Sequence, residues 1–341
     1  MGRKFIVTDC EGPISLNDNA FELSGHFIED GERFFEILSK YDDVLADEIK
    51  RPSYNAGGTL KFIVPFLKAY GANNQNVIDF SNKNIHLLKG AANTLKFINQ
   101  LMPSFIVSTS YNHYIDVLCN LTGFPYNDTY STELDLDNMS MNESELAKLK
   151  LFRERIMKDP DFDVLEEIFF KEMPKLESGS LIERIKPIGG EGKKEAVLDI
   201  ISKHNLRGSD LLYIGDSITD VQALKYANNE GGVALSFNGN EYAIRESDIS
   251  VIADNTVITS IIADLFNKYG TESAIEFAIS FSEDPDLALK AGHINQKLVT
   301  ELLEYKLPEV EIVTCKNIDR IVEMSSNFRK KLRGESVGGL G

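Results

Sequence analysis

The chain has 341 residues, 43% of them hydrophobic and 26% charged, which is enough for one large domain with insertions or for two ordinary domains. The formal net charge of −17 argues against a general nucleic-acid surface, because phosphate backbones are bound by clustered Lys and Arg. Three cysteines without a CxxC spacing argue against a disulfide scaffold or a zinc site, and no apolar run reaches the roughly 18 residues that span a bilayer. We therefore expect a cytoplasmic protein without nucleic-acid or membrane partners.

The first predicted strand is the apolar run 5–7, which leads to Asp9 and Glu11 and then to the turn Gly12-Pro13. Two carboxylates at the end of a buried strand are costly unless a cation or a reaction requires them there. The alternative is a strand that simply runs out into solvent, and these ten residues alone do not decide between the two. Residues 15–85 show helical periodicity without a clear strand, which predicts a helical cap insertion.

The next predicted unit is a helix at 90–100, a strand at 105–107 and a helix at 112–121. The hydroxyl cluster Ser108, Thr109 and Ser110 directly follows the strand. A strand that ends in a polar cluster between two helices is typical of an α/β fold. Residues 125–186 begin with an acidic stretch and continue with helical periodicity, which predicts a second, mainly helical insertion.

The α/β pattern returns at residue 187. A glycine-rich turn leads into a helix that ends near residue 204, and strands are predicted at 211–214, 233–235 and 249–252. We predict a doubly wound α/β core with a mainly parallel sheet and a site at the carboxyl ends of its strands. The predicted core comprises 1–14, 86–124 and 187–257, followed by a helical C-terminal extension at 258–333 and a flexible tail at 334–341.

A second acidic pair lies in the sequence GDSITD, where Asp216 and Asp220 are four residues apart after a predicted strand. If Asp220 lies in the first helical turn, both carboxylates can face one side. Alternatively, Asp216 or Ser217 only caps the helix. The acidic pairs after the two strands would repel each other without a cation, and such hard oxygen ligands suit Mg²⁺.

The glycine-rich sequence GGEGKK contains Lys193 at a predicted helix start. It is not a Walker loop, because Pro187 stands where the first glycine should be and Lys194 where Ser or Thr should be. A cation at a helix N-terminus is useful only if it serves a bound anion such as phosphate. The alternative is a solvated pair of surface lysines.

In chain order, these residues form an acidic pair, a hydroxyl, a lysine and a second acidic pair. This order resembles the four motifs of haloacid-dehalogenase-superfamily phosphohydrolases. The first motif corresponds to Asp9-Cys10-Glu11-Gly12, the second to Ser108, the third to Lys193, and the fourth to the segment from Asp216 to Asp220. The family usually has Asp at the position of Glu11, although Glu is familiar in branches that resemble phosphoserine phosphatase.

The resemblance implies that Asp9 attacks phosphorus and forms an aspartyl-phosphate, and that Glu11 acts as general acid and then general base. Ser108, with Thr109 beside it, would hydrogen-bond the phosphoryl oxygens, although the neighbours of Ser108 could instead cap the helix. Lys193 would hold both Asp9 and the phosphate.

The resemblance also implies a Mg²⁺ cofactor, held by Asp9, the main-chain carbonyl of Glu11, and Asp216. Asp220 would bind the metal through water or orient Lys193. The expected function is hydrolysis of a small phosphate ester. The alternatives are a phosphotransferase with the same intermediate and a non-catalytic subunit that docks a protein partner through its acidic surface or C-terminal helices. The DxEGP variant also resembles an archaeal branch that is sometimes labelled as associated with an energy-converting hydrogenase.

Overall fold

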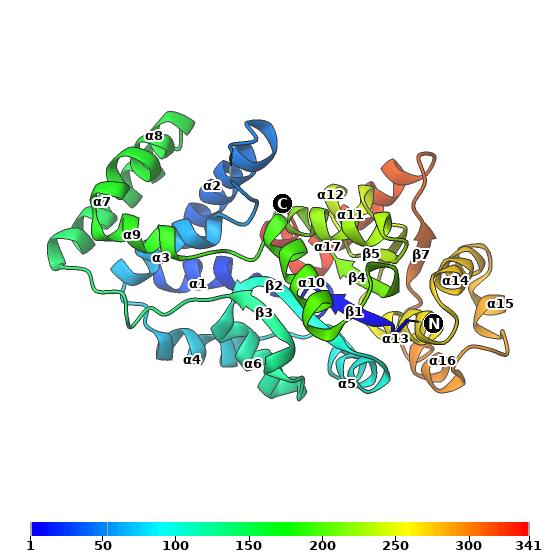
Figure 1. The fold of residues 1–341 in the computed structure, drawn as a ribbon. Helices are drawn as coiled ribbons and strands as arrows, with labels where there is room; N and C mark the ends of the chain where they lie inside the picture. The colour runs from blue at the N-terminus through cyan, green and yellow to red at the C-terminus, as the bar shows by residue number, and fades with distance from the viewer. Residues whose placement is uncertain (1, 53, 340–341) are drawn as a thin grey trace.

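The computed structural model describes residues 2–52 and 54–339 and contains one seven-stranded sheet (Figure 1). The strand order is β3-β2-β1-β4-β5-β6-β7, and all neighbours pair in parallel except β6 and β7. This confirms the predicted α/β class with a mainly parallel sheet. The strands are β1 (Phe5–Thr8), β2 (Ser104–Tyr111), β3 (Thr129–Thr132), β4 (Leu211–Gly215), β5 (Val233–Phe237), β6 (Ile249–Ile252) and β7 (Glu309–Ile312).

Helices cover both faces of the sheet and form the two long segments that interrupt it. The first half of the chain contains α1 (Asn19–Phe27), α2 (Gly31–Asp43), α3 (Thr59–Ala69), α4 (Asn74–Asn84), α5 (Ala91–Leu101), α6 (Asn112–Thr122), α7 (Glu143–Lys158) and α8 (Phe162–Glu167). The second half contains α9 (Glu177–Arg184), α10 (Glu191–His204), α11 (Val221–Asn229), α12 (Glu241–Arg245), α13 (Val257–Tyr269), α14 (Thr271–Glu283), α15 (Pro285–Leu289), α16 (Gln296–Leu302), α17 (Ile318–Arg333) and α18 (Glu335–Gly338).

The central strands are buried on both faces, which explains why they read as continuous apolar runs. Side chains alternate between the faces along each strand. Ile6 and Leu212 belong to a core shared with α5, α13 and α14, whereas Val7 and Tyr213 belong to a core shared with α10 and α11. Two helical layers therefore hold the strands in place, and the ends of the strands remain free to carry polar side chains.

The two insertions share one hydrophobic core, so they form one cap. Phe62 of α3 packs on Phe169, which lies in a short π-helix that follows α8, with ring centroids 4.5 Å apart. Tyr41 of α2 also stacks on Phe169. Residues from the segments 15–85 and 125–186 thus bury each other's apolar side chains, and in Figure 1 their helices lie together on one side of the sheet.

Two strands were missing from the sequence-based prediction. β3 lies within the segment expected to be a mainly helical insertion, and β7 lies within the expected helical extension. Both are edge strands of the sheet, and neither contains the apolar run that marks β1 or β4. In addition, β2 continues to Tyr111, so the hydroxyl cluster does not follow the strand but lies within it, where the pairing with β3 shifts register.

The short helix α18 lies in the segment predicted to be a flexible tail. Val337 of this helix packs against the core of the cap. Among the described helices, none is both long and apolar enough to cross a membrane.

Candidate active site

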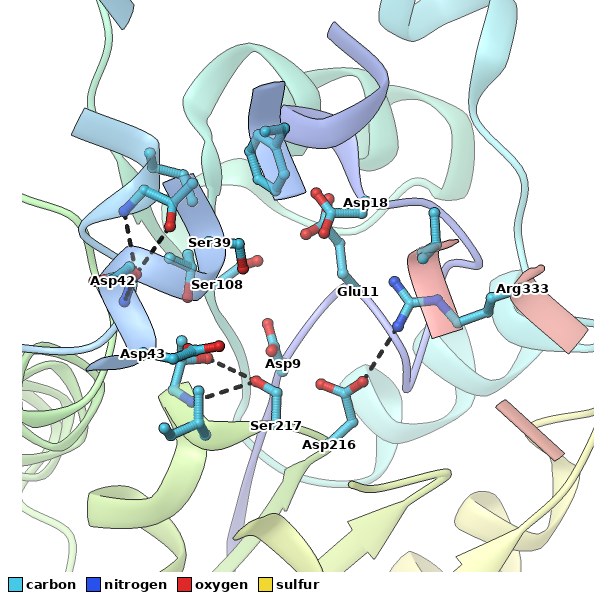
Figure 2. A pocket seen from close by; sticks show the side chains of 18 of the residues that line it. Asp9, Glu11, Asp18, Ser39, Asp42, Asp43, Ser108, Asp216, Ser217 and Arg333 are labelled. Carbon is cyan, nitrogen blue, oxygen red and sulfur yellow. Dashed lines mark hydrogen bonds and ion pairs between the residues drawn. The ribbon is translucent and has the colours of Figure 1, made fainter. Parts of the chain in front are cut away.

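A cavity of about 100 Å³ lies where the cap meets the carboxyl ends of the central strands (Figure 2). Segments that are far apart in the chain build it: the loop after β1, the end of β2, the loop after β4, the cap helices α2 and α3, and the C-terminal helix α17. Its lining includes Asp9, Glu11, Asp18, Ser39, Asp42, Asp43, Thr59, Ser108, Thr109, Asp216, Ser217, Arg329 and Arg333.

Lys193 joins the two acidic pairs predicted from the sequence. Its Nζ lies 2.6 Å from Asp9 Oδ2 and 2.7 Å from Asp220 Oδ1, and its side chain is fully buried. A solvated surface lysine at this position is therefore excluded. Burial alone would lower the pKa of Lys193, but the carboxylates of Asp220 and Asp9 raise it above its ordinary value. The residue is the third of α10, so the helix N-terminus delivers a cation to the strand ends.

Asp9 lies one residue beyond β1, which is paired with β4 so that Thr8 faces Ile214. The Asp9 amide donates to the Ile214 carbonyl at 2.8 Å, which fixes the start of the loop. Burial raises the pKa of Asp9 to about 7, and the Lys193 ammonium opposes this shift. The possibility that this strand runs out into solvent is therefore also excluded.

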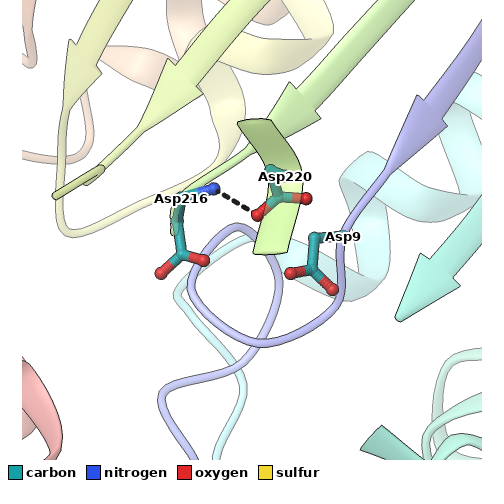
Figure 3. Close-up of side chains that lie close together, drawn as sticks. All are labelled: Asp9, Asp216 and Asp220. Atoms are coloured by element: carbon teal, nitrogen blue, oxygen red, sulfur yellow. Dashed lines mark hydrogen bonds between the residues drawn. The ribbon is translucent and has the colours of Figure 1, made fainter. Parts of the chain in front are cut away.

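Three buried carboxylates, those of Asp9, Asp216 and Asp220, each offer an oxygen within 4.8 Å of the others (Figure 3). Two oxygens that both bind one Mg²⁺ at roughly 2.1 Å lie at most about 4.2 Å apart, so small side-chain movements would bring these carboxylates onto one ion, and hard carboxylate oxygens are the ligands that Mg²⁺ prefers. The donor set therefore fits Mg²⁺. The Glu11 side chain is not in this group, and the expected ligand there is its main-chain carbonyl, which stays a prediction.

Asp220 has most of its hydrogen-bonding capacity occupied by protein donors. Its Oδ1 accepts from Lys193 and from the Tyr213 hydroxyl at 2.8 Å. Its Oδ2 accepts from the amides of Asp216 and Ser217 at 3.1 and 3.2 Å. Ser217 also caps the 3₁₀ turn, so capping and site formation coexist in this loop. The contacts favour the expected role in which Asp220 orients Lys193.

Gly12 allows the loop after β1 to approach Asp216 closely. Its φ of 95° lies in the region that L side chains rarely adopt. A Cβ atom at this position would lie 2.2 Å from Asp216 Oδ2, which is closer than atoms can pack. The glycine of the first motif therefore has a steric reason that local sequence reasoning did not give.

Glu11 lies beside Asp18 at the start of α1. Its Oε1 accepts the Asn19 amide at 2.7 Å, and Figure 2 shows the Glu11 and Asp18 carboxylates close together above Asp9. Burial raises the pKa of Glu11 well above its ordinary value, and Asp18 adds to the shift, while the Asn19 amide and Arg333 oppose it. A carboxyl group whose pKa is raised in this way suits a general acid.

Ser108 and Thr109 both line the cavity, but they have different partners. The Ser108 hydroxyl lies 3.1 Å from the Ser110 hydroxyl, within the cluster. The Thr109 hydroxyl donates to the Ile188 carbonyl at 3.0 Å and thereby ties β2 to the segment before α10. Ser108 is thus better placed than Thr109 for a ligand, and the phosphate-binding role of both residues stays a prediction.

Sequence reasoning missed the cavity residues that come from the cap and from α17. Asp42 is buried and accepts hydrogen bonds from the Tyr54 hydroxyl at 2.6 Å and from the Gly57 and Thr59 amides at 3.0 and 3.1 Å. It therefore ties α2 to the start of α3. The DD pair at Asp42 and Asp43 is visible in the sequence, but within a helical region it resembles an ordinary polar face.

Asp43→Asn is expected to stabilise the protein at pH 8. Asp43 has no hydrogen bond to its side chain from any described residue, and burial raises its pKa from 3.8 to about 7, with Asp42 and Asp47 adding to the shift. A raised folded-state pKa means that the folded state binds more protons, so stability falls as pH rises from about 4 to 7. We expect a gain of about 1–2 kcal/mol at pH 8, from about 1.4 kcal/mol per pKa unit discounted for partial exposure.

Urea unfolding at pH 4 and pH 8 measures this effect. At pH 4 the two proteins should be nearly equally stable, because the wild-type carboxyl is then neutral in much of the folded population. Asp79→Asn on the exposed face of α4 is the matched control and should change stability by less than about 0.5 kcal/mol at either pH. An equal gain or loss for Asp43→Asn at both pH values would contradict the desolvation argument.

Comparison with known proteins finds similarity in structure. No protein-family model matches the chain, and no curated protein matches its sequence. The structure of gene product AF1437 from Archaeoglobus fulgidus is similar with a TM-score of 0.81 and 27% identity, over 100% of this chain and 99% of that one. A phosphoserine phosphatase in apo form aligns with a TM-score of 0.48 and 12% identity, over 76% of this chain and 98% of that one.

A HAD family hydrolase from Salmonella enterica serovar Typhi aligns with a TM-score of 0.43 and 11% identity, over 68% of this chain and 61% of that one. Structural similarity at TM-scores below 0.5 does not support an inference about function. The similarity to the Archaeoglobus protein extends over the full chain, so the cap, the core and the C-terminal helices together form an architecture that is shared with that protein.

Proposed function

We propose that this protein is a Mg²⁺-dependent phosphomonoester hydrolase of the haloacid-dehalogenase type, with Asp9 as the nucleophile. The observation that carries the proposal is the bridge from Lys193 to both Asp9 and Asp220, with Asp216 beside them in one buried cluster. A binding module has no need of three carboxylates and a lysine at such cost in desolvation. The arrangement matches the motif order and is suited to phosphoryl transfer.

In the first step, an Asp9 carboxylate oxygen attacks phosphorus and the bond between phosphorus and the ester oxygen breaks. The leaving alkoxide takes the proton from the neutral Glu11 carboxyl, whose raised pKa supports this role. In the second step, Glu11 takes a proton from water, the resulting hydroxide attacks phosphorus, and the Asp9 carboxylate is released. Over the cycle, Glu11 gives up one proton and regains one from water, and the phosphoryl group passes from the ester to Asp9 and then to water.

Lys193, which contacts Asp9, and Ser108, which lines the cavity, would hold the phosphoryl oxygens during both steps. Mg²⁺, held by Asp9 and Asp216, would lower the repulsion between an anionic nucleophile and an anionic phosphate. The cavity of about 100 Å³ is compatible with a phosphoryl group and leaves little space for a large substrate. A small phosphate ester is therefore the substrate class that the geometry favours.

Two other functions are compatible with the same observations. A phosphotransferase would pass the phosphoryl group from Asp9 to an alcohol in place of water. A non-catalytic subunit would use the acidic surface or the C-terminal helices to bind a protein partner. The buried Lys193 bridge favours chemistry over docking, since docking does not require it.

A screen of phosphorylated amino acids, sugars and nucleotides tests the proposal. We expect at least one compound to release inorganic phosphate in the presence of Mg²⁺, to stop doing so after EDTA treatment, and to resume when Mg²⁺ is restored. An added alcohol that captures the phosphoryl group would identify a transferase. Wild-type protein that stays inactive on all three compound classes would count against the proposal.

A further inference from the structure

The C-terminal helix α17 presents one polar face to the catalytic centre. Ser325, Arg329 and Arg333 are spaced four residues apart, which places them on the same side of a helix. The Ser325 hydroxyl donates to the Gly239 carbonyl at 2.6 Å and anchors the helix to the loop after β5. The two arginines lie further along the same face and line the cavity. None of the three belongs to the four motifs.

Arg329 binds Asp216, a proposed metal ligand. One terminal guanidinium nitrogen lies 2.7 Å from Asp216 Oδ2, 3.0 Å from the Asp216 carbonyl and 2.7 Å from the Asn238 carbonyl. Arg329 is 3% exposed, so these contacts are shielded from water. Buried charge-assisted hydrogen bonds of this kind keep a carboxylate in one orientation, because a rotation that broke them would leave a buried charge without its partner.

Arg333 connects the two loops that carry the acidic pairs. It donates to the Leu16 and Asn17 carbonyls at 2.9 and 2.6 Å, in the loop that follows Glu11. It also forms an ion pair with Asp216 Oδ2 at 3.4 Å, drawn as a dashed line in Figure 2. Both arginines therefore converge on the same carboxylate oxygen, and the other oxygen of Asp216 makes no contact with them.

We infer that Arg329 is a positioning residue for the Mg²⁺ site, and that α17 is an integral part of the catalytic centre. Arg329 holds one carboxylate oxygen of Asp216 and the main-chain carbonyls of Asp216 and Asn238. The second carboxylate oxygen of Asp216 is thereby directed to the metal. The Gly12 backbone also packs against this carboxylate, because a Cβ atom at Gly12 would lie 2.2 Å from Asp216 Oδ2. Asp216 is thus fixed between a backbone and a guanidinium group before metal binds. This inference rests on the proposed function, since it assigns Asp216 to a metal.

The positive charge of Arg329 and its positioning of Asp216 have opposite effects on metal affinity. A guanidinium group beside the site repels a divalent ion, so its removal could by itself tighten metal binding. Loss of a group that orients a metal ligand instead weakens metal binding by roughly 10–100-fold. The two effects can be separated, because glutamine removes the charge but keeps an N–H donor, whereas methionine removes both.

The test is a titration with Mn²⁺ alone, followed by electron paramagnetic resonance, on wild type, Arg329→Gln and Arg329→Met. Mn²⁺ shares the preference of Mg²⁺ for oxygen ligands. We expect Arg329→Met to bind Mn²⁺ at least about 10-fold more weakly than wild type, and Arg329→Gln to bind it as tightly as wild type or more tightly. Tighter binding by both variants would overturn the inference and would identify Arg329 as a competitor of the metal.

Arg153→Met is the matched control. Arg153 is also buried, but it lies in the cap and pairs with Asp30 at 3.3 Å, so its loss should leave Mn²⁺ binding unchanged. If Arg329→Met does not fold, Arg333→Met supplies the test, because Arg333 shares the same Asp216 oxygen, and unchanged Mn²⁺ binding by a folded Arg333→Met would count against the inference. Wild-type protein that fails to bind Mn²⁺ would contradict the proposed function. Wild-type binding that Arg329→Met leaves unchanged would contradict only this inference.

Discussion

Asp9→Asn is expected to abolish phosphate release while the protein stays folded. An amide cannot serve as the nucleophile, and loss of a nucleophile lowers activity by roughly 10⁴-fold or more. Burial raises the pKa of Asp9 to about 7, so its ionised form destabilises the folded state at pH 8. Asparagine removes that cost, and Lys193 keeps Asp220 as its partner. Steady-state phosphate release and a thermal melt at pH 8 measure the two outcomes.

Asp210→Asn is the control for this prediction. Asp210 is also buried and paired with a lysine, Lys4, at 2.9 Å, but it precedes β4, at the amino end of that strand and away from the cavity. Its substitution should change stability and leave activity within about twofold of wild type. If Asp9→Asn kept more than a tenth of wild-type activity in protein free of contaminating phosphatase, Asp9 could not be the nucleophile.

The strands and site residues that could be predicted from the sequence are those for which a few adjacent residues provide the whole signal. The apolar run before Asp9 and the sequence GDSITD each combine a buried strand with a polar end, and the structure contains both strands. Lys193 gave a weaker signal, since a lysine at a helix start is ordinary and only its order among the motifs suggested a role. The 2.6 Å contact with Asp9 joins residues 184 positions apart, which no local pattern encodes.

The features that were missed depend on tertiary contacts. β3 and β7 have few apolar residues because each is an edge strand, and edge strands need less apolar surface than central ones. Arg329 lies 113 residues from Asp216 in the chain and sits in a helix with an ordinary amphipathic pattern. Periodicity identifies which face of that helix is buried, but not that a carboxylate lies beneath it.

Lys193→Met is expected to cause the largest loss of stability among these variants, together with loss of activity. The substitution leaves Asp9 and Asp220 buried and facing each other without their shared cation. Removing one partner of a buried ion pair costs about 3–5 kcal/mol. The two carboxylates raise the pKa of Lys193, so the stability that it contributes is complete at neutral pH and is lost only as pH rises above about 10.4.

The pH dependence of the variant separates this mechanism from a simple packing defect. Without the ammonium group, which lowers the pKa of Asp9, the folded state holds a proton on Asp9 more tightly, so the variant should lose stability as pH rises from about 4 to 8. Urea unfolding at pH 5 and pH 8 measures the change, and added Mg²⁺ should restore part of the loss at pH 8 by supplying a cation. The double variant Lys193→Met/Asp220→Asn should be more stable than Lys193→Met, because one of the unpaired carboxylates is gone.

Lys4→Met is the matched control for Lys193→Met. Lys4 is paired with Asp210, which keeps Arg207 at 2.8 Å as a second cationic partner, so we expect a loss of about 1 kcal/mol or less and no change in activity. If Lys193→Met were as stable as Lys4→Met and showed no pH dependence, the charge of Lys193 would not be required by the acidic cluster. The cluster would then be stable without a cation, which would remove the electrostatic reason for expecting Mg²⁺ at this site.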